Sequence, residues 1–499
     1  MKTLMQPVHM PVQEFGTCLK QILESKKISA SELARMMAYK SRNSIFRILD
    51  EEGGYGVRQA FYERLMQEDP LQLTDEERRM LGQAFEVSRV GMHVFLSNCA
   101  MQELLMNVAA EDGKARVRID ARENRKDPDF HQALADMAHG KKAYLTIVGC
   151  CERAIFEALR ERIYKTDTTC EVKITHFIYM GDEEIVHNIS AIQPLLYSDL
   201  YTAYCVEPGV FSKEREMLYR QNCVHIHMQD ANGTWYGQPL MLVDKGVFMP
   251  LKRARIGEKD PLTRLYADDV QQMTLLKTEF SAGAEMKDYL AYIRDCRTLE
   301  MNRAIYTIKP DIPLHFIHPD ILLPCLTESF REMAGEQSQE MIGELVRIHL
   351  QRWENIFSKG KVSHTVFTQE VMERFARTGR QSDHFFAIRP YTSDERVKIL
   401  SHIREQAQMN PNFRIHFFKE GCVPTMTEIG LYEGAGTLMS KPMTHYDLAG
   451  DHAEAIITQK EFCERYKSFY VQDLLERCVI SQEETLEYMD ELIEIAKMA

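Results

Sequence analysis

Six polar or basic residues lie within eight positions near the start of the chain: Lys40, Ser41, Arg42, Asn43, Ser44 and Arg47. An arginine can donate two hydrogen bonds to the edge of a guanine, and an asparagine can pair in a similar way with adenine. Lysine and arginine also neutralise phosphates, which adds affinity without sequence preference. These residue types at this spacing predict a surface that contacts DNA.

The charge of the chain is distributed in a way that supports this prediction. The whole sequence of 499 residues carries a formal net charge of -13. Between Phe15 and Leu49, seven lysines and arginines accompany only two glutamates, a balance of +5, so the other residues sum to -18. An acidic protein is repelled by nucleic acid unless its positive charge is concentrated on one module. The N-terminal segment has that concentration.

The hydrophobic pattern predicts short helices that would position the basic residues. Residues 12–27 have apolar side chains at helical spacing, and Ser29 with Glu32 forms the Ser-x-x-Glu pattern of a capping box at the start of a second helix. A third helix would turn Ile45 and Ile48 inward and leave the basic residues outside. A glycine-rich break follows, and residues 57–68 predict one more amphipathic helix.

These helices resemble the helix-turn-helix of the Cro/repressor (XRE-like) family. The matching residues are Leu19, Leu23, Glu32, Leu33, Ala34, Ile45 and Ile48. The resemblance implies that the third helix lies in the major groove, with residues 41–44 facing bases and Lys40 and Arg47 facing bases or phosphates. Ala38 stands where the family usually has glycine, and one extra residue precedes Ile45. A three-helix bundle without DNA function is the alternative.

The rest of the chain predicts several further domains. After a helix-turn-helix domain at 12–68, residues 74–110 are expected to form a helical connector, or alternatively a dimerisation helix pair, and 111–130 a linker. Apolar runs then alternate with helical patterns at 130–260, residues 263–378 are mostly helical, and 384–499 form an α/β domain with a helical tail. The expected fold class is α+β multidomain: all-α at the N-terminus, α/β with a helical insert at the C-terminus.

Two hairpins and one repeat are predicted within the α/β regions. Residues 233–251 and the glycine-rich stretch Gly430–Gly436 are each expected to form a strand pair joined by a turn. The two α/β regions suggest an internal duplication, although no residue-level self-similarity supports it. The strand-helix-strand layout around 172–184 and 413–418 also resembles the phospholipase-D-like fold, without that family's H-x-K-x-x-x-x-D motif.

No catalytic or cofactor motif is evident. Phosphate-binding loops, dinucleotide-binding glycine motifs, nucleophile elbows and H-E-x-x-H are all missing from the sequence. Two histidine pairs, 225/227 and 315/318, have no nearby carboxylate or cysteine at ligand spacing, so buried or surface histidines are favoured over a metal site. Cys150 and Cys151 follow an apolar strand and could serve as a redox sensor, but buried structural thiols are commoner.

The sequence therefore predicts a cytoplasmic, sequence-specific DNA-binding transcriptional regulator with a large C-terminal sensor or oligomerisation region. We expect double-stranded DNA as a partner, a homodimer, a small-molecule or peptide ligand, and no membrane association. No catalytic residue, cofactor or metal is expected. Two alternatives stay open: a protein-interaction or signalling scaffold with a degenerate enzyme-like α/β fold, and an enzyme of unrecognised class.

Overall fold

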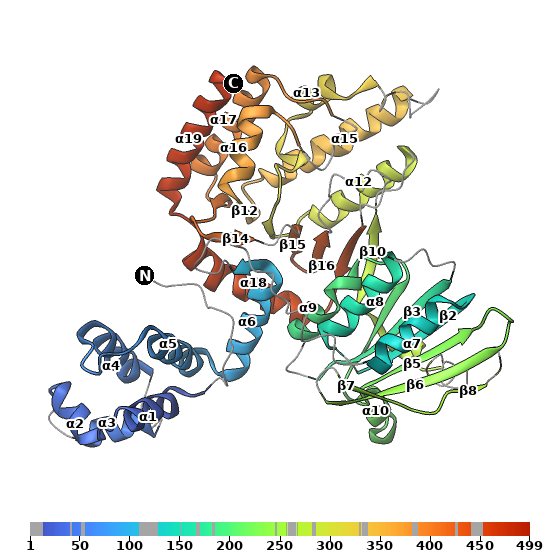
Figure 1. Cartoon of the computed structure of the whole chain (residues 1–499). Coiled ribbons are helices and arrows are strands. Elements are labelled where there is room, and N and C mark those ends of the chain that lie inside the picture. The colour runs from blue at the N-terminus through green and yellow to red at the C-terminus, as the bar shows by residue number, and fades with distance from the viewer. Residues whose placement is uncertain are drawn as a thin grey trace. The chain divides into compact units, whose positions relative to one another are not determined.

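A computed structural model of the chain shows a mixed α+β protein (Figure 1). The structure describes residues 13–39, 42–50, 55–108, 128–149, 151–165, 170–181, 185–244, 247–255, 257, 266, 268–281, 286–328, 331, 338–381, 388–424, 428–440 and 453–499. These residues divide into two compact units, 1–103 and 104–499. The linker expected at 111–130 lies almost entirely outside the described residues.

The first unit is all-α. Its helices are α1 (Phe15–Ser25), α2 (Ala30–Met36), α3 (Arg42–Leu49), α4 (Tyr55–Glu68), α5 (Asp75–Val90) and the start of α6 (Met92–Leu105). The predicted capping box is confirmed: the Ser29 side chain accepts from the Glu32 backbone N–H, and the Glu32 carboxylate accepts from the Ser29 N–H. The hydrogen bonds that the Ser29 N–H and hydroxyl donate to the carboxylate lower the pKa of Glu32. The helices expected around the basic segment are present.

One hydrophobic core joins α1 to α5. Phe15 contacts the rings of Phe61 and Phe85 edge to face, and Tyr62 stacks on Phe85 with ring centroids 4.2 Å apart. The part of the expected connector that forms α5 therefore packs on the helix-turn-helix segment. Gly91, with φ of 85°, ends α5 and separates it from α6.

The turn between α2 and α3 explains how Ala38 replaces the usual glycine. Ala38 has φ of 50°, in the left-handed region that favours glycine. Its N–H donates to the Arg35 carbonyl, and the Tyr39 N–H donates to the Ala34 carbonyl, so the end of α2 is hydrogen-bonded. The turn keeps the geometry that glycine would give, at a cost in conformational strain.

The second unit contains two large sheets. The first has the order β7-β6-β5-β2-β3-β4-β9, with β8 paired to β6. Its strands are β2 (Lys142–Val148), β3 (Glu171–Tyr179), β4 (Tyr201–Val206), β5 (Cys223–Gln229), β6 (Trp235–Asp244), β7 (Val247–Pro250), β8 (Ala254–Arg255) and β9 (Thr274–Leu275). The accompanying helices are α7 (Pro128–Ala138), α8 (Arg153–Lys165), α9 (Ile185–Leu196) and α10 (Lys213–Tyr219).

The second sheet has the order β10-β17-β16-β15-β11-β12-β13. Its strands are β10 (Lys277–Ser281), β11 (Ile305–Ile308), β12 (Ser363–Phe367), β13 (Phe413–Phe417), β15 (Glu428–Tyr432), β16 (Gly436–Ser440) and β17 (Ala453–Ile457). A short pair, β1 (Met106–Val108) and β14 (Cys422–Pro424), is separate. The helices are α12 (Met286–Glu300), α13 (Pro319–Leu322), α15 (Ser338–Ile356), α16 (Gln369–Thr378), α17 (Ser393–Met409), α18 (Lys460–Phe469) and α19 (Gln482–Met498).

Both predicted hairpins are confirmed, as β6–β7 and β15–β16. The region 263–378, however, is not only helical. Besides β9 and β10, it contributes β11 and β12, which are parallel neighbours in the second sheet. These strands have only four and five residues and stand between long helices, so their alternation is too short to be distinguished from helical pattern.

The two sheets share one topology. In the first, β2, β3 and β4 are parallel neighbours, and β5, β6 and β7 extend antiparallel from the other side of β2. In the second, β11, β12 and β13 are parallel, and β15, β16 and β17 extend antiparallel from β11. Chain order and strand direction therefore correspond for these six strands, as a duplicated unit would have them, whereas β9 beside β4 and β10 beside β17 have no counterpart in the other sheet.

We expect Ala38→Gly to raise the free energy of unfolding of the first unit by about 0.5–1 kcal/mol. The left-handed conformation costs an alanine about 1–2 kcal/mol, and the greater freedom of glycine in the unfolded chain offsets part of that gain. Both tryptophans, Trp235 and Trp353, lie in the second unit, so helical circular dichroism must follow this transition. The matched control Ala34→Gly, in a buried helical position, should lower stability by about 1 kcal/mol. If both variants lose stability, the left-handed conformation of Ala38 is not strained as proposed.

Candidate functional site

The predicted DNA-contacting residues lie at the start of α3. Arg42 is the first residue of the helix, and Arg42, Asn43 and Arg47 are exposed while Ser44 is half-buried. Residues four apart share a face of a helix, so Asn43 and Arg47 lie side by side. Ile45 and Ile48 are buried, as predicted, and fix this orientation. Three of the predicted polar and basic residues therefore lie on the exposed side of α3.

Two of the six predicted residues, Lys40 and Ser41, lie outside the described residues. Phe46 was not predicted as a site residue, and its side chain is 44% exposed one turn after Arg42. The sequence could have indicated it, because an aromatic residue stands there at a position of the helix that is not buried. An exposed phenylalanine beside arginines can contact a thymine methyl group or an apolar surface of a protein partner.

The N-terminus of α3 carries no compensating acid. The first turns of α2 and α5 contain the capping glutamates Glu32 and Glu77, whereas the first turn of α3 has no acidic residue. Helix N-termini carry partial positive charge from their unpaired N–H groups, and this charge attracts anions. With Arg42 at that end, the local potential suits a phosphate.

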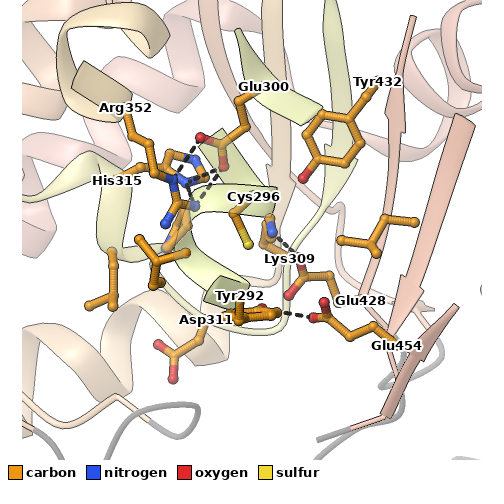
Figure 2. Close-up of a pocket in the computed structure, with 14 residues that line it drawn as sticks. Tyr292, Cys296, Glu300, Lys309, Asp311, His315, Arg352, Glu428, Tyr432 and Glu454 are labelled. Atoms are coloured by element: carbon orange, nitrogen blue, oxygen red, sulfur yellow. Dashed lines mark hydrogen bonds and ion pairs between the residues drawn. The ribbon is translucent and has the colours of Figure 1, made fainter. Parts of the chain in front are cut away.

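A second candidate site is a pocket in the second sheet, beside the carboxyl end of β11 and the start of β15 (Figure 2). Its lining includes Lys309 and Asp311, which directly follow β11, and Glu428 at the start of β15. The start of β15 lies beside the end of β11, because Ile429 pairs with Ile308 in antiparallel register. The carboxyl ends of parallel strands are the usual place for ligand sites in α/β sheets.

A buried ion pair between two helices forms one wall of the pocket. Arg352 on α15 donates to both carboxylate oxygens of Glu300 on α12, at 2.8 and 2.6 Å. Burial alone would raise the pKa of the Glu300 carboxyl, but Arg352 holds it well below its usual range. Burial lowers the pKa of His315, whose Nδ1 lies 3.2 Å both from Nη2 of Arg352 and from Oε1 of Glu300.

The opposite wall contains a second pair and a further carboxylate. Lys309 forms an ion pair with Glu428, and both side chains are largely buried. Glu454, near the start of β17, accepts hydrogen bonds at Oε1 from the Tyr292 hydroxyl at 3.1 Å and the Ser440 hydroxyl at 2.8 Å. Burial holds the pKa of Tyr292 well above its usual value, so its phenol stays a donor.

The thiol in the lining of the pocket is not activated. Cys296 also lines it, and burial raises the pKa of this thiol to about 12. A protonated thiol is a poor nucleophile at neutral pH. Of the residues that line the pocket, only His315 stood out in the sequence as a possible ligand, in a pair with His318. The lining comes from segments as far apart as Tyr292 and Glu454, so no local spacing signals it.

The predicted cysteine pair is described only at Cys151. Its Sγ lies 4.0 Å from Nε2 of His176 on β3, and Nδ1 of His176 lies 2.7 Å from the Tyr201 hydroxyl. His225 and His227 are both buried on β5, and Nε2 of His227 lies 3.1 Å from the Gly257 carbonyl oxygen. Within the described ranges, no group of three or more His, Cys, Asp or Glu residues could hold a metal ion.

Comparisons with known proteins add little to this geometry. No protein-family model matches the chain, and no curated protein sequence matches it either. Among solved structures, phosphatidylserine synthase from Haemophilus influenzae Rd KW20 is similar over 74% of this chain and 92% of that chain, at 9% identity and a TM-score of 0.22. Similarity at that level assigns neither fold nor activity to this chain. No helix in the described part of the chain is both long and apolar enough to cross a membrane.

We expect Arg352→Met to lower the free energy of unfolding of the second unit by about 3–5 kcal/mol, because it leaves the buried Glu300 carboxylate without its cation. Trp353 lies next to the mutated position, so tryptophan fluorescence in denaturant can follow the transition.

The matched control is Arg294→Met, since Arg294 pairs with Glu344 across the same two helices, α12 and α15, but at the surface. This variant should change stability only slightly because solvent screens exposed pairs. The double variant Glu300→Met with Arg352→Met should recover most of the loss. If Arg352→Met and Arg294→Met lose equal stability, breaking the buried pair costs no more than breaking an exposed pair.

Proposed function

We propose that this protein is a sequence-specific DNA-binding transcriptional regulator. The observation that carries the proposal is the exposed face of α3, on which Arg42, Asn43 and Arg47 are held outward by the buried Ile45 and Ile48. These side chains include the two types that read guanine and adenine directly. The charge balance of +5 around them, in a chain of -13, supports the same reading.

In this mechanism, the first unit binds one half-site and a homodimer reads two half-sites about one helical turn apart. The second unit serves as a sensor or oligomerisation region. A ligand or partner that binds one arrangement of the dimer more tightly would shift the population toward it and change DNA affinity. The acidic charge outside the head disfavours non-specific binding to nucleic acid.

A protein-contact surface is the second candidate, and Phe46 favours it because an exposed aromatic side chain is typical of protein interfaces. Salt dependence separates the two functions. Affinity for duplex DNA falls steeply as salt is added, since binding releases counterions from the phosphates. Contact through apolar surface is much less sensitive to salt.

The proposal is tested by selecting DNA sites from a random pool with the full-length protein. The wild type should enrich a two-part site, and Arg42→Ala with Arg47→Ala should lower affinity for that site at least about tenfold and reduce the salt slope. The control Arg64→Ala with Arg89→Ala removes the same charge from α4 and α5, where each arginine pairs with a glutamate on its own helix. The control should retain the preference.

If the wild type enriches no sequence, or if both double variants lose affinity equally, the direct reading of bases by α3 is wrong. In the second case the first unit would bind nucleic acid only through its total charge.

A further inference from the structure

One carboxylate in the pocket of the second unit has only half of its hydrogen-bonding capacity satisfied. The Glu454 side chain is 4% exposed, and both of its hydrogen bonds, from Tyr292 and Ser440, go to Oε1. Its Oε2 is buried and has no hydrogen-bond partner among the residues that the structure describes. Burying a carboxylate oxygen without a hydrogen-bond donor costs free energy, so a ligand that donates to this atom would be stabilised.

The other charges of the lining do not supply that donor. Arg352 is engaged with Glu300, and Lys309 with Glu428. Asp311 is 2% exposed and accepts from the Ile312 N–H. The lining therefore has four carboxyl groups and only two basic side chains, so acidic groups are in excess. The lining therefore favours a positively charged ligand.

Figure 2 shows Glu454 beside Glu428 and Tyr292, with Tyr432 on the other side of the pocket. The volume of about 50 Å³ holds roughly four water molecules, so only a small group fits. The rings of Tyr292 and Tyr432 belong to the lining, and aromatic rings attract cations. The described residues offer no cluster of metal ligands there, which favours an organic cation over a metal ion.

We propose that this pocket binds the primary ammonium group of a small amine. The ammonium donates one hydrogen bond to Glu454 Oε2 and neutralises part of the excess negative charge. A quaternary ammonium has the charge but no N–H to donate, so it does not satisfy Oε2. The proposal names a ligand class for the sensor role of the second unit, and it is measured without DNA, so it can fail while DNA binding stands.

The test uses the full-length protein and methylammonium chloride as the probe. Calorimetry should show saturable binding, and methylammonium should raise the unfolding temperature of the second unit, followed by tryptophan fluorescence, above that in sodium chloride of equal ionic strength. Tetramethylammonium should give neither signal. Glu454→Gln, which keeps the shape and removes the charge, should weaken methylammonium binding at least about tenfold.

Two control variants separate binding from folding. Glu433→Gln changes an exposed glutamate of the same unit and should bind methylammonium as the wild type does. Glu454→Asp keeps the charge and shortens the side chain by one methylene, so it tests the position of the carboxylate even if Glu454→Gln fails to fold, and it should also weaken methylammonium binding. Absence of binding in the wild type, equal binding by Glu454→Gln, or equal binding of tetramethylammonium would each overturn the proposal. Saturable binding of calcium or magnesium in place of methylammonium would overturn it as well.

Discussion

The antiparallel pairing of β15 with β11 is the constraint on which the second unit depends. Because Ile308 pairs with Ile429, the residues that follow β11 and those that begin β15 must meet at one edge of the sheet. The pairing of β15 with β16 places Ser440 opposite Glu428 at this edge, and Glu454 pairs with Ser440 in turn. Charged residues far apart in the sequence are thereby brought together by strand register alone.

The same register logic operates in the first sheet with different residues. There β5 pairs antiparallel with β2, and Cys151 lies three residues after the end of β2, as Asp311 lies three residues after the end of β11. The first sheet thus places a thiol and the imidazole of His176 near its edge, whereas the second places charged groups. A repeated topology without repeated residues means that the two halves share packing requirements but not chemistry.

Much of the fold could be predicted from local pattern, because caps and periodicity act over a few residues. The Ser29 capping box and the β15–β16 hairpin are examples, and both are present. The strands β11 and β12 could not be predicted, because a run of only four or five buried residues has no periodicity that distinguishes a strand from a helix. The repeat was only a hypothesis from the sequence, since strand order is a property of long-range pairing that no residue-level similarity reveals.

The face of α3 was predictable for the same reason, since one helix positions all of its side chains, but Phe46 was not assigned. The pocket could not be found in this way. Glu300, Arg352 and Glu454 lie on different elements, and each alone is typical of a solvated helix or strand end. Only burial, which depends on the whole fold, distinguishes them from surface residues.

The burial of these charges is also the strongest reason to assign the pocket a function. Desolvating a carboxylate or a guanidinium costs several kcal/mol, and well-packed apolar side chains of similar volume are often as stabilising as a buried ion pair, or more so. Stability alone therefore does not account for the Glu300–Arg352 pair, and still less for Glu454, which has no basic side chain as a partner in the described lining. Charges held at a cost to stability are a common mark of binding sites, because they are pre-arranged for a guest that restores the balance. The pocket of the second unit has this imbalance, and the acidic character of the chain thus has a specific, buried component as well as a surface one.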